Sequence, residues 1–107
     1  MFRITSGKGF HIKLENGITI STQLGGGSYC SNYEKDILRY RGSIESNDAE
    51  ISIWNKKGEW ITKEVLKEVI KDDIGWDVVY GYCKMGLWLK IIDYCKGLKG
   101  KITGENK

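Results

Sequence analysis

The chain has 107 residues, of which 40% are hydrophobic and 29% charged, and its formal net charge is +3. This length predicts one domain with a hydrophobic core and leaves no room for a second. The charge is too small for a dedicated nucleic-acid-binding protein, but it is compatible with a small anionic ligand. No apolar run is long enough to span a bilayer and the first residues lack the hydrophobic region of a signal peptide, so we expect no membrane partner.

The first part of the chain predicts a β-hairpin. Phe2–Thr5 alternates between apolar and other residues, and the alternation resumes over residues 10–15 after a glycine-rich break at residues 6–9. Asn16-Gly17 then predicts a type I′ turn, with residues 18–24 as the returning strand. Because the two strands run in opposite directions, the glycine-rich loops at residues 6–9 and 25–28 should lie together at one end of the hairpin.

A second hairpin is predicted further along the chain. Residues 49–54 and 59–61 have strand patterns, and Lys56, Lys57 and Gly58 form a turn between them. The segment from residue 34 to residue 48 is compatible with a helical turn or with a loop.

Two helices are predicted to pack on this sheet. Thr62 is the expected N-cap of the first helix. The spacing of the apolar residues in this helix places them on one face. Residues 76–83 favour extended structure. The last helix runs from about Met85 to Lys96, with Gly97 as its C′ residue.

We therefore predict an α+β fold in which an antiparallel sheet of four to five strands, built from two hairpins, is packed by two helices. This domain covers residues 1–97. Residues 98–107 are rich in glycine and lysine and are predicted to form a flexible basic tail.

The two glycine-rich loops are the first candidate binding site. Lys8 lies among glycines whose backbone amides could hold a phosphate, although the spacing is not that of a Walker A loop and ordinary turn chemistry explains it as well. The second loop contains Gly26, and Tyr29, Asn32 and Tyr33 follow it in the sequence. Aromatic rings can stack on a nucleobase and an amide can read its edge, but the two tyrosines could instead only cover the end of the sheet.

Arginines and tryptophans extend this candidate set. Arg3, Arg39 and Arg41 are the only arginines, and a guanidinium can bind a phosphate through two hydrogen bonds. Arg39 and Arg41 project together only from an extended segment, and a solvated surface pair is the alternative. Trp54 and Trp60 are candidates for a ligand or subunit surface, or for cross-strand packing.

The predicted ligand-binding residues come from both hairpins and the loops beside them. They are Lys8, Phe10, His11, Gln23, Gly26, Tyr29, Asn32, Tyr33, Arg39, Arg41 and Trp54.

The sequence predicts no catalytic site, no metal site and no cofactor. It contains no paired-carboxylate, H-E-x-x-H or nucleophile-elbow pattern, so we expect no enzymatic activity. His11, Cys30, Cys83 and Cys95 have the composition of a Cys₃His zinc site but lack its close cysteine pair. Three widely spaced cysteines instead indicate reduced thiols.

Three stretches of the N-terminal half carry a resemblance. They are Phe2-x-Ile4-Thr5-x-Gly7-Lys8-Gly9-Phe10 with Asn16-Gly17, Ser21-x-Gln23-x-Gly25-Gly26-Gly27-x-Tyr29-Cys30-x-Asn32, and Ala49-Glu50-Ile51-x-x-Trp54. The chain resembles small phage- and prophage-encoded proteins of largely uncharacterised function. In the C-terminal half the similarity is confined to Gly75-Trp76 and the final helix with Trp88.

The resemblance implies an anti-defence protein in the host cytoplasm. The predicted function is that of a homo-oligomeric sponge, which binds a nucleotide immune signal of the cyclic dinucleotide or cyclic ADP-ribose type without hydrolysing it. The alternative is an inhibitor that blocks a host defence protein by direct binding. Nucleic acid is not an expected partner.

Overall fold

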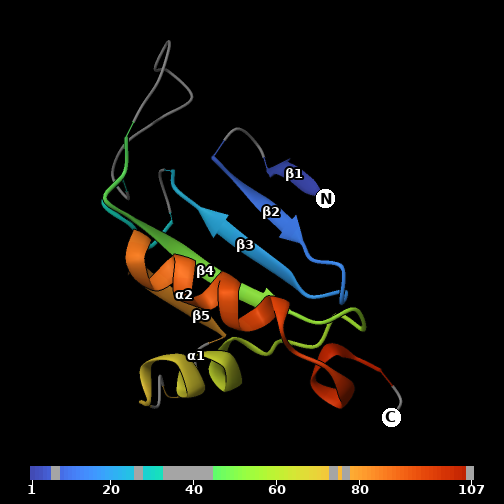
Figure 1. Cartoon of the computed structure of the whole chain (residues 1–107). Helices are drawn as coiled ribbons and strands as arrows, with labels where there is room; N and C mark the ends of the chain where they lie inside the picture. The colour runs from blue at the N-terminus through green and yellow to red at the C-terminus, as the bar shows by residue number, and fades with distance from the viewer. Residues whose placement is uncertain (6–7, 26–27, 33–44, 73–74, 76–77, 106–107) are drawn as a thin grey trace.

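Five antiparallel strands form one sheet in the computed structural model of the chain, in the order β1-β2-β3-β4-β5 (Figure 1). The structure describes residues 1–5, 8–25, 28–32, 45–72, 75 and 78–105. The strands are β1 Phe2–Thr5, β2 Gly9–Lys13, β3 Thr19–Gln23, β4 Asp48–Trp54 and β5 Val79–Lys84. Together with two helices, this sheet confirms the predicted α+β fold and the predicted number of strands.

The strands separate a core face of the sheet from an open face. Ile18 precedes β3, and it is fully buried together with Ile20 of β3 and with Ile51 and Ile53 of β4. The two helices, α1 Thr62–Ile70 and α2 Met85–Lys96, pack against this face, and α2 crosses in front of the sheet in Figure 1. Within the described residues, no helix has the length and apolar character needed to cross a membrane.

The turn of the first hairpin differs from the predicted type I′ turn. That turn needs positive φ at both central residues, but only Gly17, at +88°, has it and Asn16 does not. The Gly17 N–H donates to the Leu14 carbonyl (3.0 Å), and the Leu14 N–H donates to the Ile18 carbonyl (2.8 Å). The loop therefore contains three residues, and the β2–β3 pairing that was predicted is retained.

The second predicted hairpin is reduced to a turn closed by one bridge. Trp54 and Trp60 form an isolated antiparallel bridge, and the Ile61 N–H donates to the Ile53 carbonyl at 2.9 Å. The chain then enters α1, whose N-cap is Ile61 rather than Thr62. The Thr62 hydroxyl accepts from the Ile53 N–H at 2.9 Å instead, so this side chain fastens α1 to β4.

The segment after α2 packs against the turn that follows β4. Gly97 is the C-cap of α2, and its backbone, with φ at −92°, is in the right-handed helical region. A 3₁₀ helix follows at Gly100–Thr103. The Thr103 side chain is fully buried, and its carbonyl accepts from the Lys56 N–H at 3.2 Å. The Asn55 side-chain amide donates to the Ile102 carbonyl at 3.1 Å. The glycine- and lysine-rich composition of this segment does not predict such local order.

Candidate functional site

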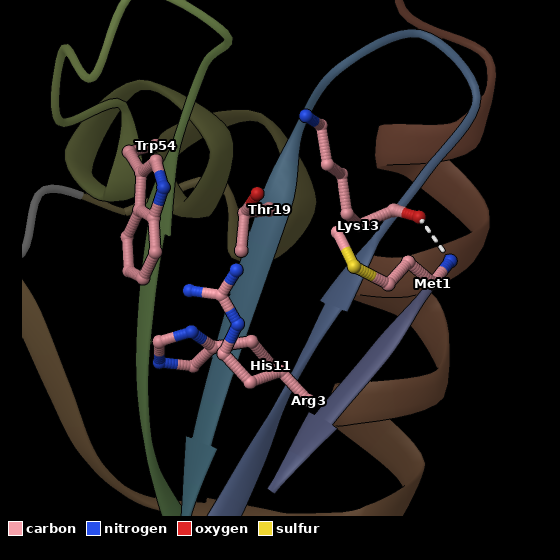
Figure 2. Close-up of a pocket in the computed structure, with 6 residues that line it drawn as sticks. All are labelled: Met1, Arg3, His11, Lys13, Thr19 and Trp54. Atoms are coloured by element: carbon pink, nitrogen blue, oxygen red, sulfur yellow. Dashed lines mark hydrogen bonds between the residues drawn. The ribbon is translucent and has the colours of Figure 1, made fainter. Parts of the chain in front are cut away.

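A cationic hollow of about 180 Å³ on the open face of the sheet is the best candidate site (Figure 2). Four strands and the residue before β1 contribute to its lining. The strand residues are Arg3 of β1, His11 and Lys13 of β2, Thr19 of β3 and Trp54 of β4, and Met1 completes the set.

Strand register explains why these side chains meet. His11 lies opposite Arg3, and Thr19 lies opposite both Lys13 and Trp54. Directly opposite residues in an antiparallel sheet project from the same face. Because Ile20 and Ile53 occupy the alternate positions in the core, the polar residues all lie on the face away from the helices, as Figure 2 shows.

Among the described residues that line the hollow, no carboxylate balances the positive charge. These described lining residues include two cationic side chains, Arg3 and Lys13, and no Asp or Glu. The Arg3 guanidinium points over the sheet toward the side of Thr19 and Trp54 in Figure 2. Such a surface attracts anions, and the attraction weakens as salt is added because both cations are exposed to solvent.

Aromatic rings form one side of the hollow. The rings of His11 and Trp54 have centroids 5.0 Å apart and an interplanar angle of 86°. Trp60 extends the group, with its ring 5.3 Å from that of Trp54 at 71°. The Trp60 side chain is 50% exposed, so the aromatic group that begins in the hollow with His11 and Trp54 continues to a solvent-exposed ring.

The surroundings of His11 favour the neutral form of its imidazole. Burial lowers the pKa of its imidazole below the usual 6.5, and the positive charge of Arg3 lowers it further. A neutral imidazole has one N–H donor and one acceptor nitrogen. An anion bound beside Arg3 would oppose the effect of that cation and raise the His11 pKa.

The structure brings two of the sequence-predicted site residues, His11 and Trp54, into this hollow and places others elsewhere. Phe10 lies on the core face, where its ring meets that of Trp88 of α2 at 6.3 Å. Gln23 is on the open face, but its amide nitrogen donates to the hydroxyl groups of Thr5 (2.9 Å) and Ser21 (3.1 Å).

Tyr29 and Asn32 lie in the loop that follows β3, beyond the end of this strand that is farther from the hollow. The Tyr29 N–H donates to the Glu50 carboxylate at 2.7 Å, and the exposed Tyr29 side chain packs beside Gly81 of β5. Asn32 is 2% exposed and donates through its side chain to the Leu24 carbonyl at 2.8 Å. The amide of Asn32 thus holds the loop in place.

The first glycine-rich loop ends beside the start of the second, as expected from the hairpin. The Leu24 N–H donates to the Lys8 carbonyl at 2.9 Å, and Gly9 lies opposite Gln23. The described residues at this end of the hairpin do not line the cationic hollow. Four predicted site residues lie outside the described part of the chain: Gly26, Tyr33, Arg39 and Arg41.

Arg3, Lys13 and Thr19 are absent from the predicted set of ligand-binding residues, although Arg3 is among the arginines considered as phosphate ligands. All three occupy the non-core positions of alternating strands, which is the signal that could have found them. Joining them also requires the strand order and register, because β1 and β4 carry the two ends of the hollow and are separated by two strands.

The cysteines do not converge with His11. Cys83 and Cys95 belong to the buried core, whereas His11 lies on the open face of the sheet. In the part of the chain that the structure describes, no group of three or more histidine, cysteine or acidic residues is placed to hold a metal ion.

Comparison with known proteins identifies no family. The chain matches no protein-family model, and no significant similarity to a curated protein or to a solved structure is found. The resemblance to small phage proteins stays a prediction.

Proposed function

We propose that this chain binds and sequesters a nucleotide ligand on the open face of its sheet and does not hydrolyse it. The observation that carries the proposal is the placement of Arg3 and Lys13 beside the Trp54 ring in one hollow. In the setting that the phage resemblance suggests, the ligand is a nucleotide immune signal in the host cytoplasm, and the protein counters host defence.

The lining residues match the parts of a nucleotide. The planar guanidinium of Arg3 can bind two phosphate oxygens at once, and Lys13 adds a point charge. The indole of Trp54 offers a surface for a base, which is worth about 1–3 kcal/mol per stacked base. The Thr19 hydroxyl can donate to, or accept from, a ribose or a phosphate.

The size of the hollow limits how much of the ligand one chain encloses. Sites for drug-sized ligands usually measure roughly 300–1,000 Å³, whereas this hollow measures about 180 Å³. It can hold a phosphate and part of one base, so a cyclic dinucleotide or cyclic ADP-ribose would extend beyond it.

The same residues favour binding over turnover. Hydrolysis of a phosphate ester by general-base catalysis needs a group that activates water, often a carboxylate or a histidine oriented by one. The described lining of the hollow provides His11 but no carboxylate beside it.

A ligand panel tests the proposal. Isothermal titration calorimetry with cyclic dinucleotides and cyclic ADP-ribose isomers should show binding of at least one, and mass spectrometry should recover it intact after heat denaturation. Arg3→Ala should weaken binding about tenfold or more, since a charge-assisted hydrogen bond contributes about 1.5–3 kcal/mol. Lys90→Ala, which removes an exposed cation from α2, is the matched control. Absence of binding by every compound would contradict the proposal.

Direct inhibition of a host defence protein is the second candidate function. The half-exposed Trp60 ring beside Trp54 favours it, because exposed tryptophans are enriched in protein interfaces. In that case Trp60→Ser should abolish binding to the defence protein, while Arg3→Ala should have a smaller effect. The opposite order would support the nucleotide site.

A further inference from the structure

Strand β1 is an edge of the sheet whose backbone directs hydrogen-bonding groups outward at two positions. The Met1 nitrogen donates to the Lys13 carbonyl at 3.0 Å, and the Lys13 N–H donates to the Met1 carbonyl at 2.8 Å. Hydrogen-bonded and non-hydrogen-bonded pairs alternate along an antiparallel ladder. The backbone groups of Arg3 therefore face β2, and those of Phe2 and Ile4 face away from the sheet.

The same two residues expose large apolar side chains. Phe2 is 79% exposed and Ile4 is 81% exposed. They lie opposite Ile12 and Phe10, and Phe10 contacts Trp88 of α2, so both project on the helix-bearing side of the sheet. Exposed apolar residues on an edge strand favour pairing with another strand, and proteins usually avoid them by placing charges or proline there.

The spacing of these residues is self-complementary. Two copies of β1 related by a twofold axis at Arg3 place Phe2 opposite the partner's Ile4 and Ile4 opposite the partner's Phe2. Both are positions with outward backbone groups, so each pair can exchange two hydrogen bonds. Each pair also matches an aromatic side chain with a β-branched one, a combination that stabilises neighbouring strands.

We propose that two copies of this chain form a dimer by antiparallel pairing of their β1 strands, which joins their sheets into one. A twofold arrangement uses the β1 edge of each copy once and closes the assembly, whereas a head-to-tail addition of strands would leave a β1 edge available for a further copy. The paired surface is short, so the dimer should be reversible and dissociate in the micromolar range.

This dimer would also bring the two cationic hollows next to each other. In the proposed register Arg3 lies opposite the partner's Arg3 on the open face. Like charges directly opposite each other weaken a strand pair. Salt or inorganic phosphate should therefore strengthen the dimer, whereas an ion-pair interface would weaken under the same conditions.

Sedimentation velocity over a range of protein concentrations tests this arrangement. Wild-type protein should shift from monomer to dimer as its concentration rises, and added phosphate should move the transition to lower concentration. Ile4→Pro should abolish the dimer without unfolding the chain, because proline is tolerated on an edge strand where its missing N–H would face solvent. Circular dichroism checks the fold.

Two further variants keep the test decisive. Phe2→Ser should raise the dissociation constant roughly thirtyfold or more, as removal of a central anchor residue does, and it does so even if Ile4→Pro fails to fold. Leu89→Ser removes a 54% exposed apolar side chain from α2 and should change nothing. A wild-type monomer at every concentration, or a dimer that persists in Phe2→Ser, would overturn the proposal.

Discussion

The rings of Trp54 and His11 meet nearly at right angles, with centroids 5.0 Å apart, although the two residues lie on strands that are not neighbours. Strand β3 runs between them and presents Thr19 and Ser21 on the same face. Because these side chains are small, they leave room above β3 for the two rings to approach each other; Thr19 is 8% exposed and Ser21 is 5% exposed. Small residues on the middle strand thus shape the aromatic side of the cationic hollow.

The pKa of His11 should lie below the usual 6.5, because burial and the Arg3 charge both disfavour the imidazolium. His11 is the only histidine, so a proton NMR titration gives one unambiguous curve. Arg3→Gln should move the pKa toward 6.5, and inorganic phosphate should raise it in the wild type. A wild-type value at or above 6.5 would show that neither effect operates.

The free energy of unfolding should depend on the protonation of the same His11 imidazole. Since the unfolded chain binds it near pH 6.5 and the folded chain only at lower pH, the free energy of unfolding should fall as the pH drops through 6.5. It should level off below the folded pKa. Urea denaturation of wild type and His11→Gln across this range isolates the contribution, because the pH dependence from this group is absent in the variant.

Two buried thiols should be nearly inert in the folded protein. Burial raises the pKa of Cys83 to about 11, with a further contribution from Asp48, and raises that of Cys95 to about 12. Because the thiolate is the reactive form, both should label slowly with a thiol reagent at mildly alkaline pH and rapidly in denaturant. Tryptic mapping of the labelled cysteines distinguishes the two sites, and rapid native labelling of either would contradict their burial.

Sequence patterns predicted local structure better than the contacts that position it. The pairing of β2 with β3 and the bounds of α2 follow from alternation and helical spacing over neighbouring residues. Threonine is a common N-cap residue, yet the Thr62 hydroxyl accepts a hydrogen bond from the Ile53 N–H of β4. Arg3 lies in the candidate site only because four strands pair in the order β1-β2-β3-β4. Such long-range partners depend on how the elements pack, which spacing along the chain does not encode.

Two glycines should respond in opposite ways to alanine. A Cβ on Gly9 would clash with the Thr22 carbonyl oxygen and lie 2.8 Å from the Gln23 Cα, so Gly9→Ala must push β2 away from β3. We expect a loss of about 2–3 kcal/mol. Gly86 in α2 has open space around it, and Gly86→Ala should stabilise the chain by about 0.5–1 kcal/mol. Urea denaturation measures both, and equal effects would contradict the β2–β3 contact.

Asn16 fastens the first hairpin to the end of α2. Its side-chain amide donates to the carbonyl oxygens of Cys95 (2.7 Å) and Leu98 (3.0 Å), while its own Oδ1 accepts from the Ile18 N–H at 3.2 Å. Asn16→Asp keeps the acceptor but removes both donors, and it places a carboxylate at the negative end of a helix dipole.

We therefore expect Asn16→Asp to lower the free energy of unfolding by about 2 kcal/mol or more, because two part-buried carbonyls lose their partners. Asn47→Asp makes the same chemical change at an exposed position and should stay within about 0.5 kcal/mol of the wild type. If the two variants unfold at the same urea concentration, the Asn16 amide does not hold the hairpin to α2. A selective loss in Asn16→Asp would show that the turn residue stabilises the fold through a contact remote in sequence.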